Sequence, residues 1–183
     1  KNPKLKRLAN TYISIQRNER EAIENQNFVD STFVSEWNQY QNKRFELLLD
    51  INSIVEIPVQ DKNILDSILK SGKAVKEFNR VYGILVDTFD PKNFVVEEVT
   101  GVSGKEKRYI GDFENTTGHY INYIDISIDF YDENDKVYYG FRFNTRYVWE
   151  NGTKKSFEFS IPDSDTRFKY FKVNLGEKSF SFE

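Results

Sequence analysis

The chain of 183 residues contains no cysteine, no methionine and one histidine, His119. The missing thiols exclude cysteine proteases, Cys-x-x-Cys redox sites and thiolate zinc sites. Sites that need two histidines are excluded as well, and a Ser-His-Asp triad would have to use His119. The sequence places no acidic residue to orient this imidazole, so we expect a surface histidine. We therefore predict a protein that is not an enzyme and uses no cofactor.

Neither sign of charge is in clear excess, since 26 Lys and Arg residues stand against 29 Asp and Glu residues. Non-specific nucleic-acid binding requires a clustered basic surface, so we expect no nucleic-acid partner. No stretch approaches the roughly 18 consecutive apolar residues of a membrane span. Because the sequence begins at Lys1 rather than at Met, we expect a processed chain that contacted a membrane only through a removed N-terminal anchor.

Aromatic residues are plentiful but unevenly distributed. Residues 1–90 hold 5 of the 16 Phe and 3 of the 11 Tyr residues, and residues 91–183 hold the rest. This change in composition predicts two domains, a helical one over 1–90 and a β-rich one over 91–183.

The first half shows the spacing of amphipathic helices, beginning with Leu5, Leu8, Tyr12 and Ile15. The first helix either runs to about Ile54 or breaks near 25–30, and Pro58 ends it in either case. A further helix begins near Asp61, a candidate N-cap, and Gly72 within it suits a close helix crossing. These segments predict an antiparallel helical hairpin, whose apolar stripes pack on each other or on a coiled-coil partner.

The second half alternates between apolar and polar residues over 120–132 and again over 137–149, the pattern of strands with one core face. If Asn134-Asp135 forms the turn between them, the numbers of opposite residues sum to 269. This register pairs Phe130 with Tyr139, Ile128 with Phe141 and Ile126 with Phe143. Further short strands separated by turn residues predict an immunoglobulin-like antiparallel β-sandwich, so the predicted fold class is α+β.

Three segments of the second half, YIGDFENTT at 109–117, ISIDFYDENDKV at 126–137 and KSFEFSIP at 155–162, resemble the bacterial FxLYD domain family. The residues that match the family pattern are Gly111, Asn115, Phe130, Tyr131, Asp132, Phe157 and Phe159. The resemblance covers about 107–173, and it departs from the family where Glu133-Asn134-Asp135 replaces the usual short glycine turn.

The resemblance implies an extracytoplasmic immunoglobulin-like fold, often found in lipoproteins or membrane-anchored surface proteins. It implies no established catalytic role, so no catalytic residue is carried over to this sequence. Two of the matching residues have physical interpretations. We expect Gly111 to allow close approach of backbone and Asn115 to open a turn through its side-chain amide.

Two groups of acidic residues are candidate sites. The run 132–135 is rich in oxygen ligands but lacks the spacing of a calcium loop, so we expect no metal there. Asp125 and Asp129 could supply the paired carboxylates of a glycosidase. The hairpin register places Arg142 and Arg146 diagonal to them, which would keep both carboxylates ionised and unsuited to acid catalysis.

The candidate interaction surface consists of aromatic residues: Tyr123, Tyr131, Tyr138 and Trp149. The three tyrosines fall at outward positions of the predicted hairpin, and Trp149 lies near a strand end. Such a face either recognises a partner or is buried beneath the helical hairpin.

The predicted function is that of a non-enzymatic, extracytoplasmic bacterial surface or envelope protein, anchored at its N-terminus, that binds a protein or another envelope macromolecule. The alternative is an NTF2-like or conjugation-type fold, in which helices and a curved sheet enclose a pocket for a small ligand or an enzyme site. That fold needs polar groups on the inward face of the sheet, whereas the inward residues predicted here are Ile and Phe. The sequence does not predict the oligomeric state.

Overall fold

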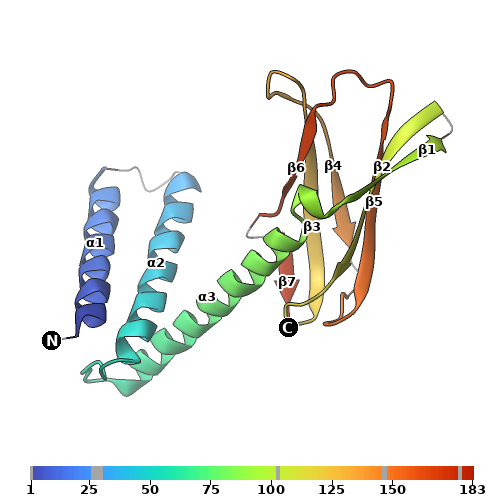
Figure 1. Cartoon of the computed structure of the whole chain (residues 1–183). Helices are drawn as coiled ribbons and strands as arrows, with labels where there is room; N and C mark the ends of the chain where they lie inside the picture. Colours follow the sequence, from blue (N-terminus) through green and yellow to red (C-terminus); the bar gives the residue numbers. More distant parts are fainter. Residues whose placement is uncertain (1, 26–30, 102–103, 146–147, 177–178) are drawn as a thin grey trace. The chain divides into compact units, whose positions relative to one another are not determined.

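The computed structural model describes residues 2–25, 31–101, 104–145, 148–176 and 179–183. Helices occupy the first part of the chain and antiparallel strands the second, which confirms the predicted α+β class (Figure 1). The chain divides into two compact units, Lys1–Arg80 and Val81–Glu183. This division falls within helix α3 (Lys62–Thr88), ten residues before the expected change at residue 90.

Unit 1 contains α1 (Pro3–Asn25), α2 (Ser31–Asn52) and the first part of α3. The sequence pattern allowed either one long helix or a break near 25–30, and the structure has the break. The hairpin is therefore formed by α1 and α2, whereas the sequence pattern paired the segment before Pro58 with the helix that begins near Asp61. Residues 26–30 lie outside the described part of the chain. The predicted N-cap of α3 is confirmed, because Asp61 Oδ1 accepts a hydrogen bond from the Asn63 amide at 2.9 Å.

Charged and small residues make the close contacts of unit 1. Glu19 on α1 is only 5% exposed, and its carboxylate accepts hydrogen bonds from Arg44 (3.2 Å) and Gln41 (3.2 Å) on α2. Gly72 confirms the predicted close crossing, because a Cβ there would lie 2.5 Å from the backbone oxygen of Phe45.

Unit 2 is a sandwich of two antiparallel sheets. The three-stranded sheet has the order β1-β2-β5, with bounds Val95–Gly101, Gly104–Glu114 and Lys154–Pro162. The second sheet has the order β4-β3-β6, with β7 also paired to β3, and the bounds are Val137–Thr145, Ile121–Tyr131, Tyr170–Asn174 and Phe180–Phe182. The short 3-10 helix η1 (Pro91–Asn93) connects α3 to β1.

The register of the β3–β4 hairpin is the predicted one from Ile124 to Phe130, where every pair sums to 269. Beyond Phe130 the pairing shifts, because Tyr131 lies opposite Val137 while Phe130 lies opposite Tyr139. Tyr138 is therefore the extra residue of a β-bulge, which removes it from the predicted alternation.

Aromatic and branched side chains fill the space between the sheets. Phe159 of β5 contacts Phe130 and Phe141 of the opposite sheet, with ring centroids 5.7 and 5.4 Å apart. Phe89, just after α3, packs on Phe157 at 5.0 Å, at one end of this core. The inward residues Ile124, Ile126 and Ile128 are each 1% exposed.

Gly111 has a different role from the one expected. A Cβ at this position would lie 2.3 Å from Phe113 Cζ and 3.0 Å from Phe94 Cε1. The glycine therefore makes room for aromatic rings on the core face of β2 rather than for a neighbouring backbone.

The last turns of α3 belong to the core of unit 2, since Val81, Leu85 and Phe89 are all buried. We expect a fragment of residues 81–183 to fold and to melt cooperatively. A fragment of 91–183 lacks these three side chains and should be less stable by at least about 3 kcal/mol, the usual cost of removing one large buried apolar group. Denaturant melts of both fragments test this. Equal midpoints would mean that the end of α3 adds nothing to the sandwich.

The two faces of β3 should differ sharply in their tolerance of substitution. Ile128→Asp buries a charge without a partner and should cost more than about 3 kcal/mol. Asp129→Ala removes an exposed hydrogen bond from Asn174 (2.7 Å) and should cost less than about 1 kcal/mol. Urea melts of the two variants decide the order, and the reverse order would show that the faces are misassigned.

Candidate functional site

The outer face of the four-stranded sheet carries an almost continuous set of polar and aromatic side chains, which we call the polar face. It consists of Tyr123, Asp125, Ser127, Asp129, Tyr131, Arg142, Asn144, Tyr170, Lys172 and Asn174. The inward residues of β3 are buried Ile and Phe, so strict alternation places its odd-numbered residues from 123 to 131 outward. Cross-strand pairing aligns Ser127 with both Arg142 and Asn174.

A hollow of about 300 Å³ lies within the polar face, lined by Asp125, Ser127, Arg142, Asn174, Gly176 and Ser179. Asp125 Oδ1 is buried and has no hydrogen-bond partner within the part of the chain that the structure describes. A buried carboxylate oxygen without a partner is costly, and a ligand that donates a hydrogen bond would relieve that cost. The hollow thus combines an acceptor with donors from Arg142 and Asn174.

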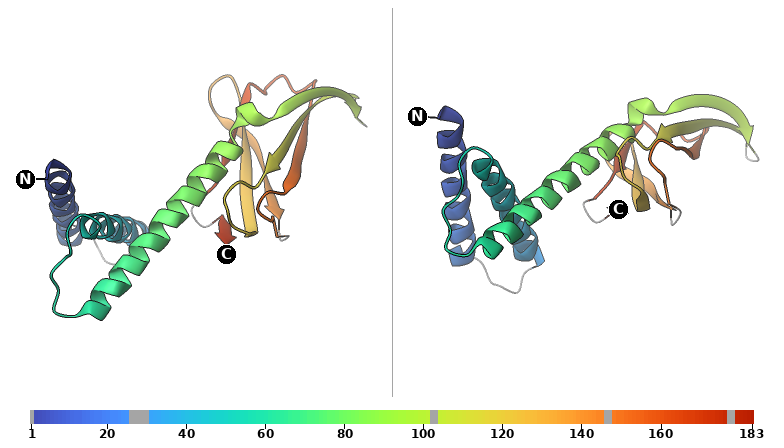
Figure 2. Two further views of the ribbon diagram at one scale, coloured as in Figure 1. Left: turned by 60° about the horizontal axis from the view of Figure 1, so that its bottom comes forward. Right: turned by 90° about the horizontal axis from the view of Figure 1, so that it is seen from below.

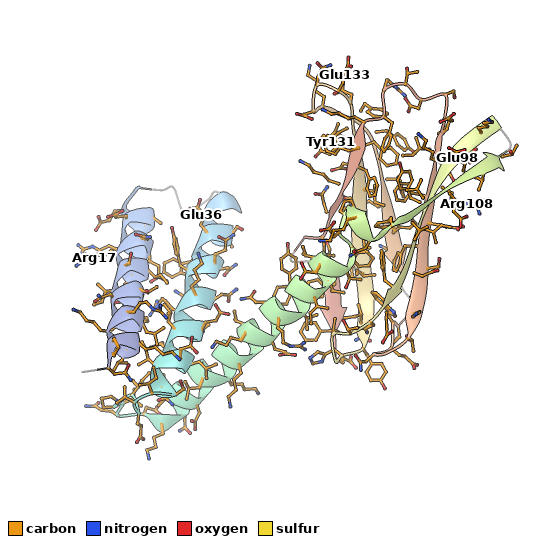
Figure 3. All side chains as sticks on the ribbon, in the orientation of Figure 1. Arg17, Glu36, Glu98, Arg108, Tyr131 and Glu133 are labelled. Atoms are coloured by element: carbon orange, nitrogen blue, oxygen red, sulfur yellow. The ribbon has the colours of Figure 1, made fainter. Side chains whose placement is uncertain are left out.

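A tyrosine pair lies on the same polar face, at the end of β3 that leads into the β3–β4 turn. The rings of Tyr131 and Tyr170 are parallel, with centroids 4.8 Å apart, and Lys172 Nζ lies 4.7 Å from the centre of the Tyr131 ring. The hydroxyl of Tyr170 donates a hydrogen bond to Asp135 in the β3–β4 turn at 3.2 Å. Tyr131 projects from the outer side of its strand in Figure 3. Stacking and cation–π contacts hold these side chains in fixed positions, which favours their use in recognition.

The structure places the four predicted surface residues at three different locations. Tyr123 and Tyr131 lie on the polar face, and Tyr123 accepts a hydrogen bond from Asn144 at 3.3 Å. Tyr138 lies at the open edge between β4 and β5, because the bulge turns it away from the polar face. Trp149 is 1% exposed and packs in the core against Phe157, so it does not belong to an interaction surface.

Tyr138 forms a compact cluster with two charged residues. Its hydroxyl donates to Asp165 Oδ2 at 3.2 Å, and the guanidinium of Arg167 lies 4.6 Å from its ring centre. Arg167 Nε in turn donates to Asp165 Oδ1 at 3.1 Å. The hydrogen bonds from Arg167 lower the pKa of Asp165, and burial together with the Asp165 hydrogen bond raises the pKa of Tyr138 to about 12.

Asn115 organises the end of the sandwich near His119. Its Oδ1 accepts from the Thr117 amide at 3.0 Å, which confirms the predicted turn, and its Nδ2 donates to the carbonyl oxygens of Trp149 and His119. The backbone of Asn115 also accepts a hydrogen bond from Gly152 N at 2.7 Å. The imidazole of His119 packs on Phe182 at 4.6 Å. These contacts connect strands and indicate a structural role.

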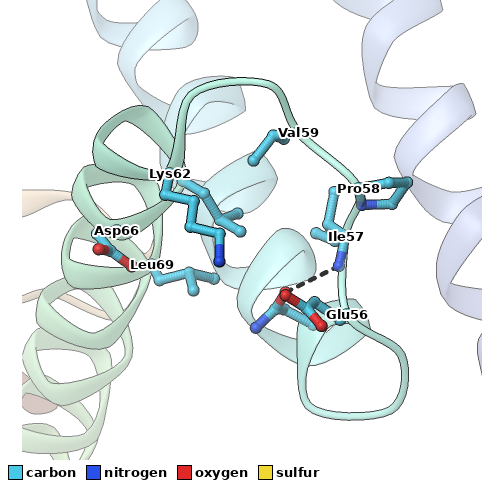
Figure 4. Close-up of a pocket in the computed structure, with 9 residues that line it drawn as sticks. Glu56, Ile57, Pro58, Val59, Lys62, Asp66 and Leu69 are labelled. Atoms are coloured by element: carbon cyan, nitrogen blue, oxygen red, sulfur yellow. Dashed lines mark hydrogen bonds between the residues drawn. The ribbon is translucent and has the colours of Figure 1, made fainter.

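A second hollow, of about 390 Å³, lies in unit 1 beside the loop between α2 and α3 (Figure 4). Ile57, Val59, Leu65 and Leu69 form its apolar part, and Glu56, Lys62 and Asp66 its polar rim. The Ile57 amide donates to Asn52 Oδ1 at 3.1 Å, which fixes the start of the loop. Unlike the polar face, this hollow contains no buried polar atom without a partner among the described residues.

Among the residues that the structure describes, no group of three or more His, Asp or Glu side chains is placed to hold a metal ion. No described helix is both long and apolar enough to cross a membrane.

Comparison with known proteins gave no relatives: no protein-family model, curated protein or solved structure matches the chain.

The sequence pattern missed the contribution of β6 to the polar face. The polar and aromatic residues of β6 alternate with buried or half-buried apolar residues, so the sequence predicts that they share one face; they are Tyr170, Lys172 and Asn174. Their position beside β3 could not be predicted, because a long connection rather than a tight turn separates the two strands.

The stabilising contribution of Tyr138 should be lost at high pH. Its folded pKa of about 12 lies above the ordinary value of 10, so the neutral hydroxyl is favoured by folding. The resulting stability is fully present below pH 10 and is lost as pH rises toward 12. The difference in unfolding free energy between the wild type and Tyr138→Phe should therefore shrink over this range. Urea melts at pH 8, 10 and 11 measure it, and a constant difference would contradict the assignment.

Proposed function

We propose that this chain is a non-enzymatic binding module on the outer side of a bacterial membrane, anchored at its N-terminus. Its polar face binds a protein or another macromolecule of the cell envelope. The observation that carries the proposal is the buried, unpartnered Oδ1 of Asp125 in a hollow beside Arg142 and Asn174. These groups offer an acceptor and donors, and the tyrosine pair farther along the polar face adds aromatic surface.

The proposed kinship with FxLYD domains is supported by what the matching residues do. Asp132 Oδ1 accepts hydrogen bonds from the amides of Asn134 and Lys136, each at 2.9 Å, and so closes the β3–β4 turn. Asn115 forms the side-chain turn described above, and Phe130, Phe157 and Phe159 are buried in the core. The extracytoplasmic location and the lipoprotein-like anchor rest on this resemblance.

The proposal does not extend to an NTF2-like pocket. The side chains that face each other between the two sheets are aromatic and aliphatic, and their rings are in contact. The polar groups of the binding hollow lie on the opposite, outer side of β3.

Site-specific photo-crosslinking tests the polar face. A photoreactive amino acid at Ser127, in the centre of the face, should crosslink to a macromolecule in envelope fractions of the source cells. The same group at Glu158, an exposed outward residue of β5 on the other sheet, is the matched control and should give much less product. Tyr131→Ala should weaken the Ser127 crosslink about five- to thirty-fold, the usual effect of removing an aromatic anchor.

Crosslinking that is equal from residues 127 and 158, or unchanged by Tyr131→Ala, would count against the polar face. The circular dichroism spectrum and melting temperature of each variant show that a loss of product is not a loss of fold.

A further inference from the structure

The two sheets of unit 2 have four open edges, at β1, β5, β4 and the side of β3 where β6 and the three-residue β7 pair. The outer edge of such a strand carries backbone N–H and C=O groups without strand partners, which can pair with another chain. Proteins commonly block such edges with charged side chains, above all lysine, or with proline, a bulge or a very short strand. The edges can therefore be compared by the protection that each carries.

Three of the four edges are protected. β5 begins with Lys154 and Lys155 and ends at Pro162. β4 carries the bulge at Tyr138. β6 has only five residues, with Lys172 exposed at its centre.

β1 is the exception among the edges that the structure describes. It is seven residues long, contains neither lysine nor proline, and pairs with β2 in continuous register from Val95 to Gly101. Val95 and Val96 are 63% and 51% exposed, although they point to opposite faces. Figure 2 shows the β1–β2 hairpin extending past the remaining strands of the sandwich.

The direction of each backbone group in β1 follows from the neighbouring ladder. Lys105 O accepts from Asp163 N and Asn115 N donates to Thr153 O, so odd-numbered residues of β2 bond toward β5. Even-numbered residues of β2 then bond to β1, and their partners there are odd-numbered. Val96, Glu98 and Thr100 therefore direct their N–H and C=O groups to the open edge.

The charges of β1 select the kind of strand that can pair there. Glu97 and Glu98 are both exposed, and Lys107, which lies opposite Glu98 on β2, pairs instead with Asp163 at 3.8 Å. A second copy of β1, paired over all seven residues, would place Glu98 opposite Glu98, and like charges in that position destabilise a sheet. A strand with basic residues opposite Glu97 and Glu98 is favoured.

We propose that the open edge of β1 binds an extended, basic segment of a partner protein, which adds an antiparallel strand to the three-stranded sheet. Backbone hydrogen bonds to Val96, Glu98 and Thr100 provide the binding energy. Lysine or arginine opposite Glu97 and Glu98 provides the specificity. This site lies on a different sheet from the polar face and does not depend on its function.

The test is a fluorescence-polarisation titration of the full chain with a labelled peptide, Gly-Thr-Val-Lys-Arg-Val-Val-Gly. Its Lys and Arg lie opposite Glu98 and Glu97 in the antiparallel register. Glu98→Pro removes an edge-facing N–H and should weaken binding at least tenfold while leaving the β1–β2 ladder intact. Glu158→Pro is the matched control, because by the same parity it removes an edge-facing N–H from β5, and it should leave binding unchanged.

Glu98→Lys keeps the N–H and reverses the charge, so it should also weaken binding, and a peptide with Glu and Asp in place of Lys and Arg should not bind. The proposal is overturned by absence of saturable binding, by equal binding of the wild type and Glu98→Pro, or by equal binding of the two peptides. A wild-type dimer that Glu98→Pro converts to monomer would overturn it as well. Ser127 crosslinking of the same variants remains intact in either case, which separates this result from that of the polar face.

Discussion

Strand β3 carries the constraint on which unit 2 depends, because β4, β6 and β7 all pair with it. Its inward isoleucines fill the core, and its outward residues form the centre of the polar face. The two roles cannot be separated, since a slip of one residue would exchange the faces. Whatever fixes the register of β3 therefore also places Asp125 in its hollow, and the closure of the β3–β4 turn by Asp132 contributes to that register.

The sequence predicted correctly those features that depend on the alternation of apolar residues and on the residues of a tight turn. The β3–β4 register was predictable because the apolar alternation and the turn at 134–135 agree. The bulge was not predictable, because the apolar and polar residues of β4 alternate in the same way with or without it. The bulge nevertheless changes the direction in which Tyr138 points. Trp149 was misplaced for a related reason: it follows the end of β4 and forms only an isolated bridge with Ile121, so strand parity did not apply to it.

Unit 1 shows the limit of periodicity in helices. Apolar spacing predicted the helices and Gly72 predicted a close crossing, but Glu19 and Arg44 look like ordinary surface charges in the sequence. Their burial is set by the partner helix, which spacing within one helix does not reveal. An ion pair between buried Glu19 and half-buried Arg44 adds little net stability but disfavours any alignment of α1 and α2 that leaves the Glu19 charge alone.

The hydrogen bonds around Asn115 also affect a spontaneous chemical change of this protein, the deamidation of Asn151. Asn151-Gly152 is a dipeptide prone to deamidation, which requires the Gly152 nitrogen to attack the Asn151 side chain. In the folded unit that nitrogen donates to Asn115 O at 2.7 Å, and Asn151 Oδ1 accepts from Gly118 N at 2.8 Å. The hydrogen bond from Gly152 N to Asn115 O has to break before this nitrogen can attack Asn151 Cγ, so we expect deamidation to be slower in the folded unit than in the unfolded chain. The fraction of chains with aspartate at position 151 would then increase with the time that unit 2 spends with this hydrogen bond broken.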